Sequence, residues 1–201
     1  MLVKKRDGSP RFCIDYRSLN AITAKDLYPL PRIDDVIDRL SGSMIFSKVD
    51  LRSGYFQLPL APNEREKTAF VTPDGLWQFN RLPQGLKNSP SVFQRLMNQT
   101  LGTLRWDVCL AYLDDIVIYS RSFHQHLIDV DRVCHALQSS NFKLHPDKCC
   151  FFRREISCLG HHINAHGCSP TDDNIRAILQ FPVPRSSKAA CNEGILLVSP
   201  S

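Results

Sequence analysis

The chain has 201 residues, with 25 Lys or Arg and 20 Asp or Glu, so its formal charge is +5. This length allows one domain, or two small ones, with a sizeable core. The mildly basic balance is compatible with a polyanionic partner but does not identify one. Eight cysteines without a signal peptide or a long apolar span favour a reducing, intracellular location and no membrane partner.

The first part of the chain predicts a hairpin, a connector and a helix. Leu2 to Arg17 reads as two strand-like runs around a turn at residues 7–10, with Lys and Arg gathered at its tip. Residues 28–32 (YPLPR) are rich in proline and therefore extended. Apolar side chains at 33, 36, 37 and 40 then mark one face of a helix that ends at Gly42.

The next stretch alternates in the manner of β-strands. Residues 44–49 predict a strand that ends at Asp50, and residues 67–71 and 76–80 predict a second hairpin. Residues 81–91 form a constrained loop that leads into a helix with Ser89 as its N-cap. The expected buried stripe of this helix is Val92, Phe93, Leu96, Met97 and Leu101.

Residues 111–120 (AYLDDIVIYS) carry the main chemical signal of the sequence. An apolar run, Asp114-Asp115 and a β-branched run predict a hairpin whose tight turn is the Asp-Asp pair. Adjacent carboxylates repel each other, and their pKa values rise unless a cation neutralises them. Mg²⁺ prefers such hard oxygen ligands. A solvated turn is the commoner interpretation of a bare Asp-Asp pair, so a further carboxylate is needed, and Asp50 at its strand end supplies one.

Helical and turn signals alternate through the rest of the chain. A helix is expected with the buried stripe Phe123, Leu127, Val130, Cys134 and Leu137. A loop at 141–150, a hairpin from 151 to 162 with a turn at 164–167, and a short helix at 172–180 complete the prediction.

Three segments in this order resemble the palm of a reverse transcriptase, most closely of the gypsy-type LTR retrotransposon Pol polyproteins. They are VDLRSGYFQLPL (49–60), FNRLPQGLKNSPSVFQRLMN (79–98) and AYLDDIVIYS (111–120), and the similarity runs from Leu2 to Pro184. The resemblance implies an α+β fold: a right-hand polymerase palm with partial fingers and the start of the thumb. The implied parts are 1–43 (partial fingers and connector), 44–145 (palm, with a fingers-like insertion near 61–90), 146–184 (palm-thumb junction with a primer-grip-like hairpin) and 185–201 (divergent tail).

The resemblance also implies roles for individual residues. Asp50, Asp114 and Asp115 would be the catalytic residues and would hold two Mg²⁺ ions, with Mn²⁺ as a substitute. In the nucleotide site, Lys5 and Arg11 would hold the triphosphate and Tyr55 would exclude a 2′-hydroxyl. Gln84 would contact the incoming nucleotide, and Tyr112 would pack at the primer terminus and the sugar. Leu159, Gly160 and His161 would hold the primer end.

The implied function is RNA-directed DNA polymerase, which transfers nucleotides from dNTPs to a DNA primer on an RNA or DNA template. Parts of the fingers, the thumb, RNase H and integrase of a longer polyprotein are missing from this sequence, so we expect weak or no synthesis from the chain alone. In an intact element the protein would reside in cytoplasmic virus-like particles.

Two alternatives stay open. The chain is also compatible with a truncated, inactive retroelement remnant that only binds nucleic acid. A more distant alternative is a zinc-binding module, because Cys and His are frequent between residues 149 and 168, although they do not form paired C-x-x-C units.

Overall fold

Residues 2–4, 8 and 10–179 are described by the computed structural model of the protein. Helices and antiparallel sheets occupy different stretches of the chain, so the fold class is α+β, as the sequence predicted. Among the helices in these ranges, none combines the length and the apolar character needed to cross a membrane.

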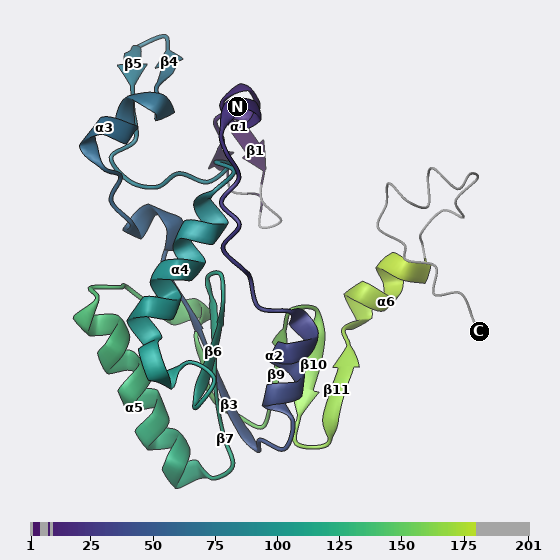
Figure 1. The fold of residues 1–201 in the computed structure, drawn as a ribbon. Coiled ribbons are helices and arrows are strands. Elements are labelled where there is room, and N and C mark those ends of the chain that lie inside the picture. Colours follow the sequence, from purple (N-terminus) through teal and green to yellow (C-terminus); the bar gives the residue numbers. More distant parts are fainter. Residues whose placement is uncertain (1, 5–7, 9, 180–201) are drawn as a thin grey trace.

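A four-stranded antiparallel sheet lies at the centre of the molecule (Figure 1). Its order is β6-β7-β3-β8, with the bounds Cys109–Tyr112, Asp115–Ser120, Ile45–Asp50 and Cys150–Arg153. The register of β3 on β7 runs without a break from the Ile45–Ser120 pair to the Asp50–Asp115 pair. Because side chains alternate along a strand, this register fixes which of them share a face.

Helices α4 (Ser89–Leu101) and α5 (Phe123–Ser139) cover one face of the sheet (Figure 1). Phe93, Met97 and Leu101 of α4 are fully or almost fully buried, in one cluster with Val49 and Ile116 of the strands. The predicted stripe of α4 is therefore largely confirmed. Val92 is exposed, however, and the N-cap is Asn88 rather than Ser89, whose hydroxyl donates instead to the carbonyl of Pro83.

The predicted stripe of α5 was wrong in part, because the buried side of this helix includes polar residues. Its buried residues are His126, Asp129, Val133 and Leu137, whereas Phe123 and Leu127 are exposed. Hydroxyl groups on the sheet satisfy the buried polar atoms: His126 lies 2.8 Å from Ser47 Oγ and 2.9 Å from Ser120 Oγ. Ser120 Oγ also donates to the Asp129 carboxylate. Hydrophobicity alone could not identify this face, since buried polar groups need specific partners.

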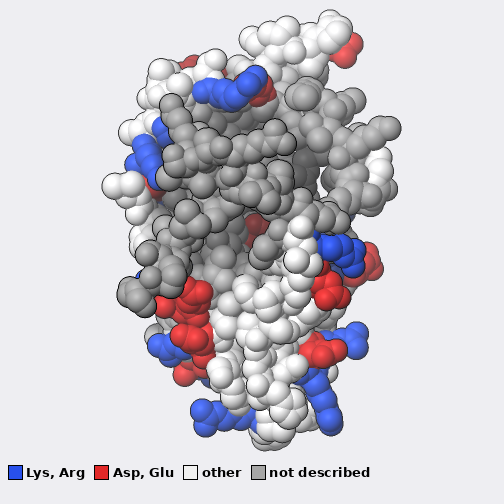
Figure 2. Space-filling model, turned by 90° about the vertical axis from the view of Figure 1, so that its right-hand side faces the viewer, with Lys and Arg blue, Asp and Glu red and all other residues white. Residues whose placement is uncertain are grey.

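The predicted helix after the connector is present as α2 (Ile33–Leu40). It covers the opposite face of the central sheet together with a second sheet. This sheet has the order β11-β10-β9, with the bounds Gly167–Pro170, His161–Asn164 and Glu155–Cys158, and α6 (Asp172–Leu179) follows it. The last residue of the predicted final helix, Gln180, lies outside the described residues. Figure 2 turns this side of the molecule to the viewer, and its lower half carries Lys, Arg, Asp and Glu side by side.

The smaller elements lie above the central sheet in Figure 1. They are β1 (Leu2–Lys4), β2 (Pro10–Phe12), α1 (Arg17–Ile22), α3 (Pro62–Arg65), β4 (Phe70–Thr72) and β5 (Gly75–Trp77). Both predicted hairpins, β1-β2 and β4-β5, are present. The strand run predicted to reach Arg17 is wrong at its end. Tyr16 is buried there and donates its hydroxyl to the carbonyl of Thr68, so a tertiary contact ends the extended run.

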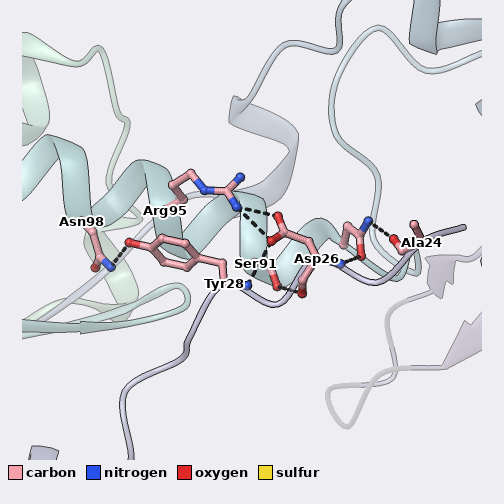
Figure 3. Close-up of polar contacts among 7 residues, drawn as sticks. Ala24, Asp26, Tyr28, Ser91, Arg95 and Asn98 are labelled. Atoms are coloured by element: carbon pink, nitrogen blue, oxygen red, sulfur yellow. Dashed lines mark hydrogen bonds and ion pairs between the residues drawn. The ribbon is translucent and has the colours of Figure 1, made fainter.

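The predicted connector (28–32), together with Asp26 just before it, is fastened along α4 by side chains (Figure 3). Arg95 Nη2 donates to both carboxylate oxygens of Asp26, at 2.9 and 2.8 Å. Its guanidinium also lies 4.8 Å from the centre of the Tyr28 ring, whose hydroxyl accepts from Asn98. Polar side chains of α4 thus hold an extended segment that has no β-sheet partners of its own among the described residues.

Candidate active site

Two carboxylates lie side by side at one end of the central sheet. Asp50 is the last residue of β3 and Asp115 the first of β7, and they are partners in the antiparallel register. Directly opposed residues point to the same face of a sheet. By this alternation, both side chains belong to the face of Phe46 and Val117, away from α4 and α5.

The third carboxylate occupies the hairpin turn itself. Tyr112 pairs with Asp115, so the two turn residues are Leu113 and Asp114, one position earlier than predicted. Leu113 has φ 53°, which a two-residue hairpin requires at this position but which is costly for a residue with a Cβ. The aspartate pair therefore divides, with Asp114 in the turn and Asp115 in the strand.

Asp114 is closely packed and electrostatically unfavourable as an anion. A Cβ built on Gly54 would stand 3.3 Å from the Phe93 ring and 3.4 Å from Asp114 Cβ, so the backbone at position 54 packs directly against the turn. The pKa of Asp114 is raised, mainly by burial, which outweighs a hydrogen bond to its own backbone. The charges of Asp115 and Asp50 raise this pKa further, and Lys148 opposes them.

Asp115 already has a cationic partner within the protein. Lys48 Nζ donates to Asp115 Oδ2 at 3.0 Å, and both side chains are largely buried. Burial by itself would lower the pKa of Lys48, but the hydrogen bond and the charges of Asp115 and Asp50 leave it above its usual value. This ion pair orients Asp115, and within the described part of the chain Asp50 and Asp114 are the carboxylates of the site without such a partner.

The donor set fits Mg²⁺ better than zinc. Among the described residues, no group of three or more His, Cys, Asp or Glu side chains is close enough to hold a metal ion, and this applies to the Cys- and His-rich segment 149–168 as well as to Asp50, Asp114 and Asp115 as a set of three. Mg²⁺ commonly takes only one or two protein carboxylates and completes its shell with water and substrate phosphates. Asp50 and Asp114 match that pattern. The pKa of Asp114 is raised in part by the charge of Asp50, and a divalent cation would relieve this repulsion.

Two tyrosines lie near the carboxylates. Tyr55 belongs to a 3₁₀ turn (Gly54–Gln57) rather than to a strand, and its ring centre is 5.0 Å from that of Phe93. Burial and the charge of Asp114 raise the pKa of Tyr55 to about 12, so its hydroxyl stays protonated. Tyr112 ends β6 and is half-buried. Roles for both in nucleotide binding stay predictions.

The other residues predicted to contact the nucleotide are Lys5, Arg11 and Gln84. Lys5 and the side chain of Arg11 are outside the described part of the structure, although the backbone of Arg11 pairs with Val3. Gln84 is exposed in the turn before α4 and borders a cavity of about 220 Å³ together with Phe12 and Tyr16. The assigned roles of these three residues also stay predictions.

The predicted primer-binding residues form the turn between β9 and β10. Leu159 and Gly160 both have positive φ, and His161 begins β10. A Cβ on Gly160 would overlap the side chain of Asn174, which donates to the Gly160 carbonyl at 2.9 Å. Position 160 therefore requires glycine, and the first turn of α6 is fixed to this loop. Primer binding by this turn stays a prediction.

The structure adds Gln94, a residue that the sequence analysis missed. Its side chain is fully buried and donates to the Ala111 carbonyl at 2.9 Å, while its oxygen accepts from Leu113 N at 2.8 Å. It thereby holds the β6 side of the hairpin tip, next to Asp114. The spacing of Gln94, Met97 and Leu101 by three and four residues is a signal that could have placed it on the buried side.

Comparison with known proteins identifies the family. The model of the family described as reverse transcriptase (RNA-dependent DNA polymerase) matches residues 3–163, and the chain belongs to this family. Within it, the chain is similar to the Pol polyproteins of LTR retrotransposons. It is 40% identical over 189 residues to the retrovirus-related Pol polyprotein from transposon 297 of Drosophila melanogaster, and 33% identical over 188 residues to the Tf2-3 polyprotein of Schizosaccharomyces pombe.

The same comparisons show how much of each protein is shared. The match with the transposon 297 polyprotein covers 92% of this chain but 18% of the relative, and the Tf2-3 match covers 94% and 14%. The chain thus spans less than a fifth of the length of these relatives.

Solved structures confirm the fold. The foamy viral protease-reverse transcriptase dRH in complex with ds DNA superimposes with a TM-score of 0.83 and 25% identity, over 95% of this chain and 33% of that one. The foamy viral protease-reverse transcriptase in complex with dsDNA gives 0.81 at the same identity, over 95% and 40%. The predicted polymerase palm is therefore confirmed as the fold of this chain.

Proposed function

We propose that this chain is the palm-containing part of an RNA-directed DNA polymerase that adds nucleotides from dNTPs to the 3′-hydroxyl of a DNA primer on an RNA or DNA template. The observation that carries the proposal is the position of Asp50, Asp114 and Asp115 at one sheet end, with the pKa of Asp114 raised by burial and by its two neighbours. A site that concentrates negative charge in this way is suited to cations and the phosphates they accompany.

In this proposal the side chains of the site have different roles. Asp50 and Asp114 would be the metal ligands, and Asp115, paired with Lys48, would orient the site. Tyr55, supported by Phe93, would form the floor beneath the sugar, where a 2′-hydroxyl would clash. Lys5 and Arg11 would hold the triphosphate, Gln84 and Tyr112 would contact the nucleotide and primer terminus, and the Leu159-Gly160-His161 turn would hold the primer end.

Asp50 and Asp114 would hold a pair of Mg²⁺ ions, which would supply positive charge for the triphosphate and lower the pKa of the primer hydroxyl; Mn²⁺ would be a substitute. Positioning and charge neutralisation account for most of the catalysis of phosphoryl transfer, so a nucleophilic side chain is not required. Contacts with the template-primer would be mainly to backbone phosphates, since the enzyme must copy any sequence.

We assign residues 1–43 to partial fingers and connector, 44–145 to the palm, 146–184 to the palm-thumb junction and 185–201 to a divergent tail. An intact element would use the protein in cytoplasmic virus-like particles.

Primer extension tests the proposal. The chain is lengthened at both ends with the flanking segments of the transposon 297 polyprotein, and incorporation of dTTP is measured on poly(rA)/oligo(dT) with Mg²⁺. We expect synthesis, and a loss of at least about 100-fold in Asp114→Asn, because a charge that acts on the transition state is removed. Asp74→Asn, in the exposed β4-β5 turn, is the matched control and should keep wild-type activity.

The outcomes separate the two remaining functions. If the lengthened polypeptide incorporates no nucleotide but still binds the template-primer, the chain is the inactive remnant. Equal activity in Asp114→Asn and wild type would refute the assignment of the site.

A further inference from the structure

The backbone N–H of Asp50 is held by a side chain rather than by a neighbouring strand. Strand β8 pairs with β3 only as far as the Lys48–Cys150 pair, two residues short of Asp50. Beyond that point the Asp50 N–H donates to the sulfur of Cys149 at 3.4 Å, and the Cys149 thiol lies 3.8 Å from the Asp50 carbonyl oxygen. The same carbonyl accepts from the backbone of His145 at 2.9 Å.

Cys149 lies at a gap in the backbone hydrogen bonds that join β3 and the residues after it to residues 143–153. The pairing resumes beyond Asp50, where Leu51 bridges to Leu144 and Arg52 N donates to the Lys143 carbonyl. The thiol therefore replaces one rung of the ladder at the position of a proposed metal ligand. Cys149 is partly buried and packs against the hydrophobic core, and this packing fixes its position.

We propose that Cys149 is a positioning residue for Asp50: its thiol fixes the end of β3 and thereby the direction of the Asp50 carboxylate. This inference rests on the proposed function of the site. A small error in the position of a catalytic group costs much in rate, so a single contact of this kind has a measurable effect. Among the described residues, the backbone of His145 holds the Asp50 carbonyl, but the partner of the Asp50 N–H is the Cys149 sulfur and no ion pair is recorded for the Asp50 carboxylate.

The neighbouring cysteine provides a matched control. Cys150 is exposed on the edge strand and makes no described side-chain hydrogen bond, although it differs from Cys149 by one position. Replacement of either thiol by alanine removes the same atoms. Cys149→Ser keeps a hydroxyl that can accept from Asp50 N and donate to its carbonyl, so it should rescue what Cys149→Ala loses.

The first test of the contact between Cys149 and Asp50 uses measurements that do not depend on enzymatic activity. In the 201-residue chain, deuterium exchange of the Asp50 amide is measured by NMR for wild type, Cys149→Ser, Cys149→Ala and Cys150→Ala, together with unfolding in urea. We expect exchange about tenfold faster in Cys149→Ala, near-wild-type exchange in Cys149→Ser, and no change in Cys150→Ala. Exchange in Cys149→Ala that equals wild type would overturn the proposal.

The consequence for catalysis is tested in the lengthened polypeptide described above. We expect kcat to fall about tenfold in Cys149→Ala and the Mg²⁺ concentration for half-maximal activity to rise, with KM for the template-primer unchanged and recovery in Cys149→Ser. A fall only in proportion to the folded fraction, with an unchanged Mg²⁺ requirement, would refute the positioning role while the proposed function stands. An inactive wild type would instead refute the proposed function, and the amide exchange would still decide whether the thiol holds Asp50.

Discussion

At the scale of single residues, the geometry of the site depends on one strained position and on the side chain that supports it. Leu113 has a positive φ, and its N–H donates to the buried Gln94 side chain. Without that partner, a partly buried donor would lose its hydrogen bond beside an already unfavourable backbone conformation. Gln94 thus stabilises the turn that presents Asp114.

We expect Gln94→Met, which keeps the size of the side chain but not its polar atoms, to destabilise the protein. The buried Ala111 carbonyl and the partly buried Leu113 N would lose their partner, at a cost of about 2 kcal/mol in the free energy of unfolding. Urea unfolding of the 201-residue chain measures this. Gln99→Met, on the exposed side of the same helix, should change stability by less than about 0.5 kcal/mol. Equal effects of the two substitutions would contradict the role of Gln94.

At the scale of elements, helices are fixed to their neighbours by polar side chains as well as by apolar ones. Helix α5 buries His126 against Ser47 and Ser120 of the sheet, and α4 binds the connector through Arg95 and Asp26. The contacts of His126 with Ser47 and of Arg95 with Asp26 join segments that are distant in the sequence. They therefore specify which helix face turns inward, which apolar packing alone leaves less defined.

The buried His126 makes stability depend on pH. Burial lowers its pKa below the usual 6.5, and this outweighs the charge of Asp129. As the pH falls through 6.5, the unfolded chain binds a proton that the folded chain does not, so the free energy of unfolding decreases until the folded-state pKa is reached. Unfolding in urea at pH 7.5 and 5.5 should show a smaller decrease in His126→Gln than in wild type. His135→Gln, exposed on the same helix, is the control, and an unchanged pH dependence in His126→Gln would refute the prediction.

The ion pair of the connector should contribute more than an ordinary surface pair. Arg95 and Asp26 are 42% and 21% exposed and share two hydrogen bonds, so Asp26→Asn should cost about 1 kcal/mol in the free energy of unfolding. Glu64→Gln breaks the more exposed pair with Lys67 and should cost about 0.5 kcal/mol or less. The comparison is made by urea denaturation, and the reverse order of the two effects would show that the connector is held in another way.

At the scale of the whole molecule, two cores on opposite faces of one sheet bring distant segments of the chain to a single sheet end. The net charge of +5 is small, and the face in Figure 2 carries both signs. Attraction for nucleic acid would therefore come from local groups of Lys and Arg rather than from the total charge.

Binding of the template-primer should depend on salt and little on sequence. If even three phosphates are neutralised, the association constant for an RNA/DNA duplex should fall more than about tenfold between 50 and 200 mM KCl. Fluorescence anisotropy with two duplexes of unrelated sequence measures this, and their affinities should agree within about threefold. Affinity that is independent of salt, or that is strong for only one sequence, would contradict recognition through the phosphate backbone.

The sequence by itself determined the α2 helix and the two short hairpins, because these depend on local periodicity, and its motifs, which are continuous in the chain, predicted the fold class through their resemblance to a known family. The same motifs marked three aspartates as candidates for the site. Only the tertiary structure decided the turn at Leu113-Asp114, the inward face of α5 and the contacts of Gln94 and Cys149. Each of these depends on a partner from another part of the chain, such as Ser47 for His126. A hydrophobic pattern specifies which side of an element is apolar, but the partners of buried polar groups are known only once the segments have been brought together.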